Sequence, residues 1–288
     1  MNMDCFKINK RSQSLSPIAS VSRILGAENV KRILRIETCA QEVILSLPDN
    51  SNLARLDATL VSLLDPPPEN VVGFKSICAY RGGLRISNPS YEEADAALKH
   101  YISSQQKRIE QGPLRDHILR VVFSLAIKHE KPVQFHIGLG DTDSDLLEAN
   151  PLLLRPILED PLFKERLKVI LLHTYPYSRQ AGFLASVYDN VWVDFGLAIP
   201  HLSKAGQESV VRELMELAPL NRILFSSDAH SFADMYYLAS LWSRHAIAKV
   251  LRECIESEEV DNEEHAHEIA KDIFFGNANN LYKLNLLP

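Results

Sequence analysis

Short runs of apolar residues alternate along the chain with longer segments in which apolar positions recur every three or four residues. The short runs are rich in β-branched and aromatic residues, as buried strands are, and the longer segments have the period of an amphipathic helix. Strands and helices that alternate in this way form a parallel sheet covered by helices. The predicted strands are 33–37, 71–80, 133–138, 169–173, 191–196 and 222–228.

Helix start signals between the strands support this α/β interpretation. An S-x-x-E capping box at Ser90 predicts a helix from there to about residue 110, and Pro113 begins another helical period. Asn150 and Pro151 have the pattern of an N-cap followed by a first-turn proline, and Pro156 predicts that the helix after them is kinked or broken. Further helices are predicted over 203–218, about 231–256 and 263–274.

The composition is that of a globular protein. The chain has 288 residues, of which 46% are hydrophobic and 24% charged, so one large core can be buried. The opening segment 1–29 is polar and Ser-rich, and we expect it to be irregular, with a single barrel domain over 30–288. A net charge of -6 argues against a general affinity for nucleic acid or anionic membranes. Small molecules are the expected partners.

The cysteines and the hydropathy pattern indicate a cytoplasmic protein. The four cysteines lie far apart and form no C-x-x-C pair, so neither a zinc knuckle nor a disulfide framework is indicated. The N-terminus lacks the apolar stretch of a signal peptide, and no run of about 18 apolar residues occurs. We therefore expect a soluble, unsecreted chain with reduced thiols.

Three of the predicted strands lead into residues that can bind a metal ion. His136, His173 and Asp228 follow the apolar runs of the third, fourth and sixth predicted strands. Because the carboxyl ends of parallel barrel strands open onto one face, these side chains are expected to meet in one pocket. Two imidazoles and a carboxylate are suitable donors for a divalent metal. Taken singly, each His also fits a hydrogen-bonded core residue and Asp228 fits a helix cap.

A family resemblance rests on long segments of the sequence. VVGFKSICAYRGGL, PVQFHIGLGDTDSDLLEANPLLLRP, VILLHTYPYSRQAGFLASVYDNVWVDFGLAIP, ILFSSDAH and GNANNLYKLNL resemble the metal-dependent amidohydrolases of the amidohydrolase-2 group. The resemblance is closest to the domain that is joined to a glutamine-synthetase-like domain in FluG-like and nodulin-like proteins, and it extends from about Val30 to the C-terminus. It implies a (β/α)8 TIM barrel.

The resemblance also implies roles for individual residues. His136 and His173 match the metal or substrate histidines at the fifth and sixth barrel strands, and Asp228 matches the metal-binding acid and general base at the eighth. His173, if it is not a ligand, could stabilise a developing oxyanion. The remaining residues, expected to contact substrate, are Lys75, Tyr80, Arg81, Asp141 and His230. Lys75 and Arg81 also fit exposed charges beside a strand, and Asp141 also fits a helix cap.

One feature of the family pattern is absent. The family begins with a strand that ends in His-x-His and supplies two metal ligands, whereas the first His of this chain is His100. Only six strands are predicted, so we expect an incomplete barrel that lacks its first one or two strands. Three explanations are open: a gene model that starts late, a missing N-terminal part, or a diverged protein that has lost metal binding.

The predicted activity is metal-dependent hydrolysis of a C–N, amide-like bond in a small acidic substrate, with γ-glutamyl chemistry suggested by the family resemblance. The resemblance implies a divalent metal, Zn or Mn. One alternative is a non-catalytic partial barrel that binds a ligand or partner, and another is a decarboxylase or isomerase on the same scaffold. A homo-oligomer, or association with a glutamine-synthetase-like domain, is expected by family analogy.

Overall fold

A parallel sheet of six strands forms the centre of the protein. The computed structural model describes residue 26 and residues 30–230 and 232–286, so the segment 1–29, predicted to be irregular, lies outside the described residues except for Gly26. The strands are β1 (Arg32–Arg35), β2 (Val71–Ser76), β3 (Val133–His136), β4 (Val169–Leu172), β5 (Val191–Asp194) and β6 (Ile223–Leu224). Each is one of the six predicted strands, and the α/β fold is confirmed.

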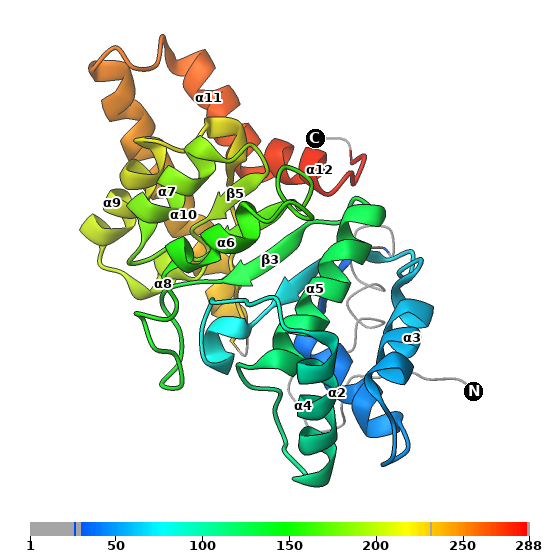
Figure 1. Cartoon of the computed structure of the whole chain (residues 1–288). Helices are drawn as coiled ribbons and strands as arrows, with labels where there is room; N and C mark the ends of the chain where they lie inside the picture. Colours follow the sequence, from blue (N-terminus) through cyan, green and yellow to red (C-terminus); the bar gives the residue numbers. More distant parts are fainter. Residues whose placement is uncertain (1–25, 27–29, 231, 287–288) are drawn as a thin grey trace.

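The order of the strands in the sheet is their order in the chain. Every strand pairs in parallel with the next, from β1 to β6, with one register irregularity between Arg32 and Ile33. The colours in Figure 1 accordingly change from one end of the sheet to the other. Within the described part of the chain β1 and β6 each have one strand neighbour, so the sheet is an open, barrel-type arc and not a closed barrel.

Helices connect the strands, and their bounds differ from the predictions in physically interpretable ways. Residues 36–37, the end of the first predicted strand, belong instead to a helix that was not predicted, because Ile36 turns directly from β1 into helical backbone. The helix capped by Ser90 ends at Ser103 and does not extend to about residue 110. Directly after Ser103 the sequence becomes polar, and Gln105 has a positive φ of 52°. The helices are α2 (Ile36–Ser46), α3 (Leu53–Leu64), the 3-10 helix η2 (Cys78–Arg81), α4 (Tyr91–Ser103) and α5 (Pro113–Lys128).

The second half of the chain has the same alternation. Pro156 breaks the helix there, as predicted, into a 3-10 turn and one short α-helical turn. The predicted helix 263–274 continues through a π-helical turn into the last helix. The elements are η3 (Pro151–Leu154), α6 (Arg155–Leu158), α7 (Ser178–Val187), α8 (Ala198–His201), α9 (Lys204–Met215), η4 (Leu220–Arg222), α10 (Ala233–Glu256), α11 (Glu263–Lys271), η5 (Asp272–Gly276) and α12 (Asn277–Leu281).

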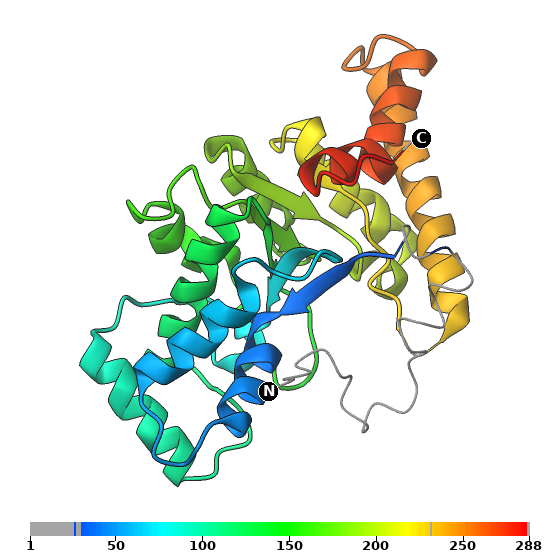
Figure 2. The same ribbon diagram turned by 90° about the vertical axis from the view of Figure 1, so that its right-hand side faces the viewer.

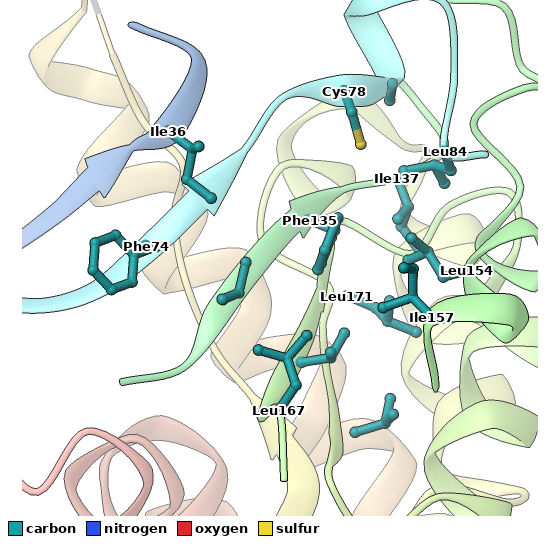
Figure 3. Packing of buried hydrophobic residues seen from close by; sticks show 14 of the residues in the cluster. Ile36, Phe74, Cys78, Leu84, Phe135, Ile137, Leu154, Ile157, Leu167 and Leu171 are labelled. Atoms are coloured by element: carbon teal, nitrogen blue, oxygen red, sulfur yellow. The ribbon is translucent and has the colours of Figure 1, made fainter. Parts of the chain in front are cut away.

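The main core lies between one face of the sheet and the helices. Successive strand residues point to opposite faces, so Phe74, Phe135 and Leu171 face the helices while their neighbours face the inside of the arc. Figure 3 shows these residues packed with apolar side chains from the connecting segments. Phe123 of α5 lies edge-on against Phe135, with ring centroids 5.7 Å apart. This apolar packing fixes the strand positions, and hence the residues at the strand ends.

The inner face of the arc carries a smaller apolar cluster and is closed at one end by α12. Ile170, Leu172, Leu224 and Leu281 form this cluster, with Ala278 and Tyr282 packed against it. The Tyr282 hydroxyl accepts a hydrogen bond of 2.7 Å from the Gln134 amide. Both views show the C-terminal helices on the side where the strands begin (Figures 1 and 2). The opposite side, where the strands end, is left open for a site. No helix in the described ranges is long and apolar enough to cross a membrane.

Candidate active site

Two adjoining cavities lie at the carboxyl ends of the strands. The inner cavity has a volume of about 250 Å³ and the outer one about 420 Å³, and Lys75 and Asp228 line both. The polar residues of the inner cavity are Lys75, Gln134, His173, Asp194, Ser226, Asp228 and Tyr282. The outer cavity is lined by Arg35, Lys75, Tyr80, Arg81, Arg108, His136, Asp141, Asp143, Asp228 and His230, among others. Every predicted site residue therefore lines one or both cavities.

His136 and His173 lie side by side in this region. His136 is the last residue of β3 and His173 follows β4, and the two ring centroids are 4.7 Å apart. Their exposed fractions are 3% and 1%. The Nε2 atom of His136 and both ring nitrogens of His173 are buried and have no hydrogen-bond partner among the described residues. Buried polar atoms are normally paired, so these nitrogens are candidates for binding a ligand or a metal.

Asp228 completes the predicted trio. Its Oδ2 atom lies 3.8 Å from Nε2 of His173, and its side chain is 35% exposed to the outer cavity. Both His173 and Asp228 have left-handed backbone conformations, with φ of 76° and 44°. Non-glycine residues rarely adopt this region, and such strain is common at functional sites. The structure thus brings together three side chains that are separated by up to 92 positions in the sequence.

Burial sets the protonation of the two histidines. It lowers the pKa of His136 to about 3 and places the pKa of His173 well below its ordinary value, in each case chiefly because the charged form loses its hydration. Nearby Lys75 acts in the same direction on both. Both imidazoles are therefore neutral at pH 7, and the neutral ring is the form that coordinates a metal ion.

Asp194 is a site residue that the sequence interpretation missed. It ends β5, and its Oδ1 atom accepts hydrogen bonds from the backbone N–H groups of His173 at 3.3 Å and Gly196 at 2.9 Å. Burial raises the pKa of this carboxyl to about 6. The signal was present, since the apolar residues 191–193 lead into an acid, just as neighbouring apolar runs lead into His. Asp194 holds the backbone of His173 in place and lines the inner cavity.

The β2 side of the outer cavity is built by the 3-10 helix η2. Tyr80 stacks against His136 with ring centroids 4.2 Å apart, and burial raises the pKa of its phenol to about 12, so that the hydroxyl remains protonated. The next residue, Arg81, has its Nε and Nη1 atoms buried without a hydrogen-bond partner in the described part of the chain. Its nearest carboxylate, on Glu110, is 3.8 Å away.

The donor set meets the requirements of a divalent metal in part. His136, His173 and Asp228 offer two neutral imidazole nitrogens and a carboxylate, which suits a divalent ion chemically. No group of three or more His, Cys, Asp or Glu side chains in the described ranges is already gathered closely enough to hold an ion. The residues present therefore fit part of a metal site, and a complete ligand set requires further donors.

Comparisons with known proteins agree with the fold. Residues 92–284 match the amidohydrolase family model. Protein fluG of Emericella nidulans is 34% identical over 292 aligned positions, which cover 91% of this chain and 33% of that protein. The chain thus spans about a third of the length of this curated relative.

Solved structures show the same relationship. A crystal structure from Lactobacillus casei, provisionally assigned as a metal-dependent hydrolase, has a TM-score of 0.83 and 33% identity, covering 95% of this chain and 71% of that one. Uronate isomerase of Thermotoga maritima has a TM-score of 0.63 at 16% identity, covering 97% of this chain and 59% of that one, and shows similarity of fold alone. On the family match and the FluG similarity together, the chain belongs to the amidohydrolase family.

Proposed function

We propose that this chain is a metal-dependent hydrolase that cleaves an amide-like C–N bond in a small acidic compound. The observation that supports this most is that two buried, neutral imidazoles with unpartnered ring nitrogens, His136 and His173, lie beside each other and near the Asp228 carboxylate where the two cavities adjoin. A core built for stability alone would pair or replace these groups, because an unmade buried hydrogen bond costs about 1–3 kcal/mol.

The residues of the chain have distinct tasks in this proposal. His136, His173 and Asp228 hold the divalent ion, for which we propose Zn or Mn. When bound, such an ion would lower the pKa of a coordinated water to about 7 and would polarise the substrate carbonyl. Asp228, which faces both cavities, takes the proton of the attacking water and returns it to the leaving amine. The ring of His173 lines the inner cavity, so it can stabilise the oxyanion there if it does not bind the metal.

The cations that line the outer cavity together with Asp228 support an acidic substrate. Lys75 and Arg81 line the outer cavity, as do Tyr80, Asp141 and His230. A carboxylate bound by such cations is held in a fixed pose by charge-assisted hydrogen bonds. We propose a γ-glutamyl amide as the substrate type, on the combined support of this basic wall and the family resemblance.

Metal analysis of the purified chain tests the proposed metal site. We expect about one equivalent of Zn or Mn after incubation with the metal and removal of the excess, and loss of most of it in Asp228→Asn and His173→Asn. His265 and Asp261 form a comparable His–Asp pair on the surface, 3.2 Å apart, so His265→Asn is a matched control that should retain the metal. Equal metal content in all variants would refute this site.

Hydrolysis is measured separately with the metal-loaded chain. γ-Glutamyl-4-nitroanilide should release 4-nitroaniline faster than the neutral acetyl-4-nitroanilide, and Asp228→Asn should abolish the difference. Equal rates for the two substrates would contradict the preference for an acidic substrate. No release from either, in metal-loaded protein, would contradict the hydrolase assignment.

A second candidate function is ligand binding without turnover. The observation that favours it is the lack of a preassembled three-donor metal group within the described residues. In that case the two cavities bind an anionic compound while Asp228 and His173 serve only to line them. Measured ligand binding in a chain that takes up no Zn or Mn would support this alternative over the hydrolase.

A further inference from the structure

The outer cavity has a basic wall at which two cations lie directly across from each other. Arg35 of β1 and Lys75 of β2 are register partners in the parallel pair, so they project from neighbouring strand ends. Both line the outer cavity. Like charges at opposed positions of paired strands repel and destabilise the pairing. Arg35 is exposed, so its packing does not offset this repulsion.

Carboxylates of the protein compensate this wall only in part: Asp141 and Asp228 line the same cavity, and the charge of Asp228 favours the protonated form of Lys75. In the described part of the chain neither Arg35 nor Lys75 forms an ion pair within 4.0 Å. Arg81, on the same cavity, has two buried guanidinium nitrogens without a hydrogen-bond partner and only the distant Glu110 contact at 3.8 Å. By contrast, Arg108 on the rim of this cavity is paired with Asp143 at 3.2 Å. Arg35 and Lys75 are therefore unpaired among the described residues, and Arg81 has only its long contact with Glu110.

We infer that Arg35, Lys75 and Arg81 form a subsite for a dianion, and that the compound bound in the outer cavity is a small dicarboxylate. One carboxylate has two oxygens and cannot reach three separate cations closely, whereas two carboxylates can engage all three through charge-assisted hydrogen bonds. The cavity, at about 420 Å³, has room for a ligand larger than an isolated inorganic dianion.

This inference deepens the proposed function, since it specifies the acidic substrate of the same site and adds Arg35 as a residue that determines specificity. It makes the hydrolysed compound a γ-glutamyl amide whose amine part carries a second carboxylate, because the glutamyl group itself keeps only its α-carboxylate. Arg35 contacts the substrate and takes no part in bond cleavage. Its substitution should therefore change ligand binding and KM, while kcat at saturating substrate changes little.

Calorimetric titration of the full chain in EDTA tests the subsite apart from any metal or turnover. The probes are glutarate, butyrate as the monocarboxylate, and inorganic phosphate as the small dianion. We expect glutarate to bind about tenfold or more tightly than butyrate, and Arg35→Gln to weaken glutarate binding by about tenfold, corresponding to one lost charge-assisted contact. Arg252→Gln, which removes an exposed Arg of α10, is the matched control and should bind as the wild type does.

A thermal unfolding measurement accompanies the titration. Because Arg35→Gln removes one of two opposed like charges, its Tm without ligand should equal or exceed that of the wild type, which also shows that the variant is folded. Unchanged glutarate affinity in Arg35→Gln, or equal affinity for butyrate, would overturn the subsite. Preference for phosphate over glutarate would overturn the dicarboxylate assignment. Since EDTA is present, these outcomes are independent of the metal and hydrolysis tests of the proposed function.

Discussion

Replacement of Arg115 provides the sharpest test of how the helix layer shapes the site. Arg115 of α5 is 1% exposed, and its guanidinium donates hydrogen bonds to the backbone carbonyls of Arg81 at 2.9 Å, Gly83 at 2.9 Å and Arg85 at 2.5 Å. It also pairs with the buried carboxylate of Asp116 at 2.7 Å. One buried cation thus fixes the loop that carries Arg81 into the outer cavity.

The expected loss of stability follows from these contacts. Arg115→Met keeps much of the apolar volume but leaves the Asp116 charge without its cation, and breaking a buried pair in this way costs about 3–5 kcal/mol. Each carbonyl that loses its donor adds about 1–3 kcal/mol if water cannot replace it, although these contributions are not additive. A decrease of at least about 4 kcal/mol in the free energy of unfolding is therefore expected. Arg115→Lys keeps the charge but loses the fork of donors, so its free energy of unfolding should lie between those of the wild type and Arg115→Met.

Urea denaturation followed by circular dichroism measures this change. The matched control is Arg155→Met, because Arg155 pairs with Glu159 at 2.8 Å on the exposed surface, where such pairs contribute about 0–1 kcal/mol. If Arg115→Met does not fold, the comparison of Arg115→Lys with Arg155→Met still shows whether the buried arginine contributes more stability than the exposed one. Free energies for Arg115→Met and Arg115→Lys within about 1 kcal/mol of that of Arg155→Met would refute this account of the loop.

Two further predictions concern stability near the site. Burial raises the pKa of Glu37 above 4.5, so the folded state loses stability as pH rises from 4.5 through the folded pKa. Glu37→Gln should remove this loss. A difference between the urea midpoints of the wild type and Glu37→Gln that does not change with pH would contradict this prediction. A Cβ on Gly196 would lie 2.1 Å from Oγ and 2.6 Å from the carbonyl oxygen of Ser226, so Gly196→Ala should lower the Tm and displace the segment that leads to Asp228. A Cβ on Gly182 of α7 would come no closer than 3.7 Å to its neighbours, which are Glu213, Leu214 and Leu217. Gly182→Ala should therefore raise the free energy of unfolding by about 0.5–1 kcal/mol, and equal effects of the two substitutions would contradict the steric explanation.

The parts of the site that could be predicted are those that strand topology determines. His136, His173 and Asp228 each follow a short apolar run, and parallel strands align their carboxyl ends whatever the length of the connecting helix. The same logic applied to the run 191–196 would have identified Asp194. It was missed because an acid followed by Phe and Gly resembles an ordinary strand-to-loop turn.

Contacts made by the helix layer were harder to predict. The helix α3 has a sequence signal, since Asn52 caps Arg55 N and Leu53, Leu56 and Leu60 recur at helical spacing. The helix α2 has a weaker one, because its first residue continues the apolar run of β1 without a break. The bond between Gln134 and Tyr282 joins positions 148 residues apart. No local pattern predicts such a contact, which depends on how α12 closes the inner face.

The features of the open end cannot be explained by stability. His173 and Asp228 both have left-handed backbone, which costs a non-glycine residue about 1–2 kcal/mol and which glycine would adopt freely. Lys75 is a cation whose pKa burial lowers, so its charged form is disfavoured in the fold, and Arg35 beside it adds to that effect. Each of these costs falls on a residue that lines the cavities, while the opposite face of the sheet packs with apolar side chains. Residues kept in place against their own conformational and electrostatic preferences support the proposed anion and metal, which would compensate the cations and use the unpartnered imidazole nitrogens.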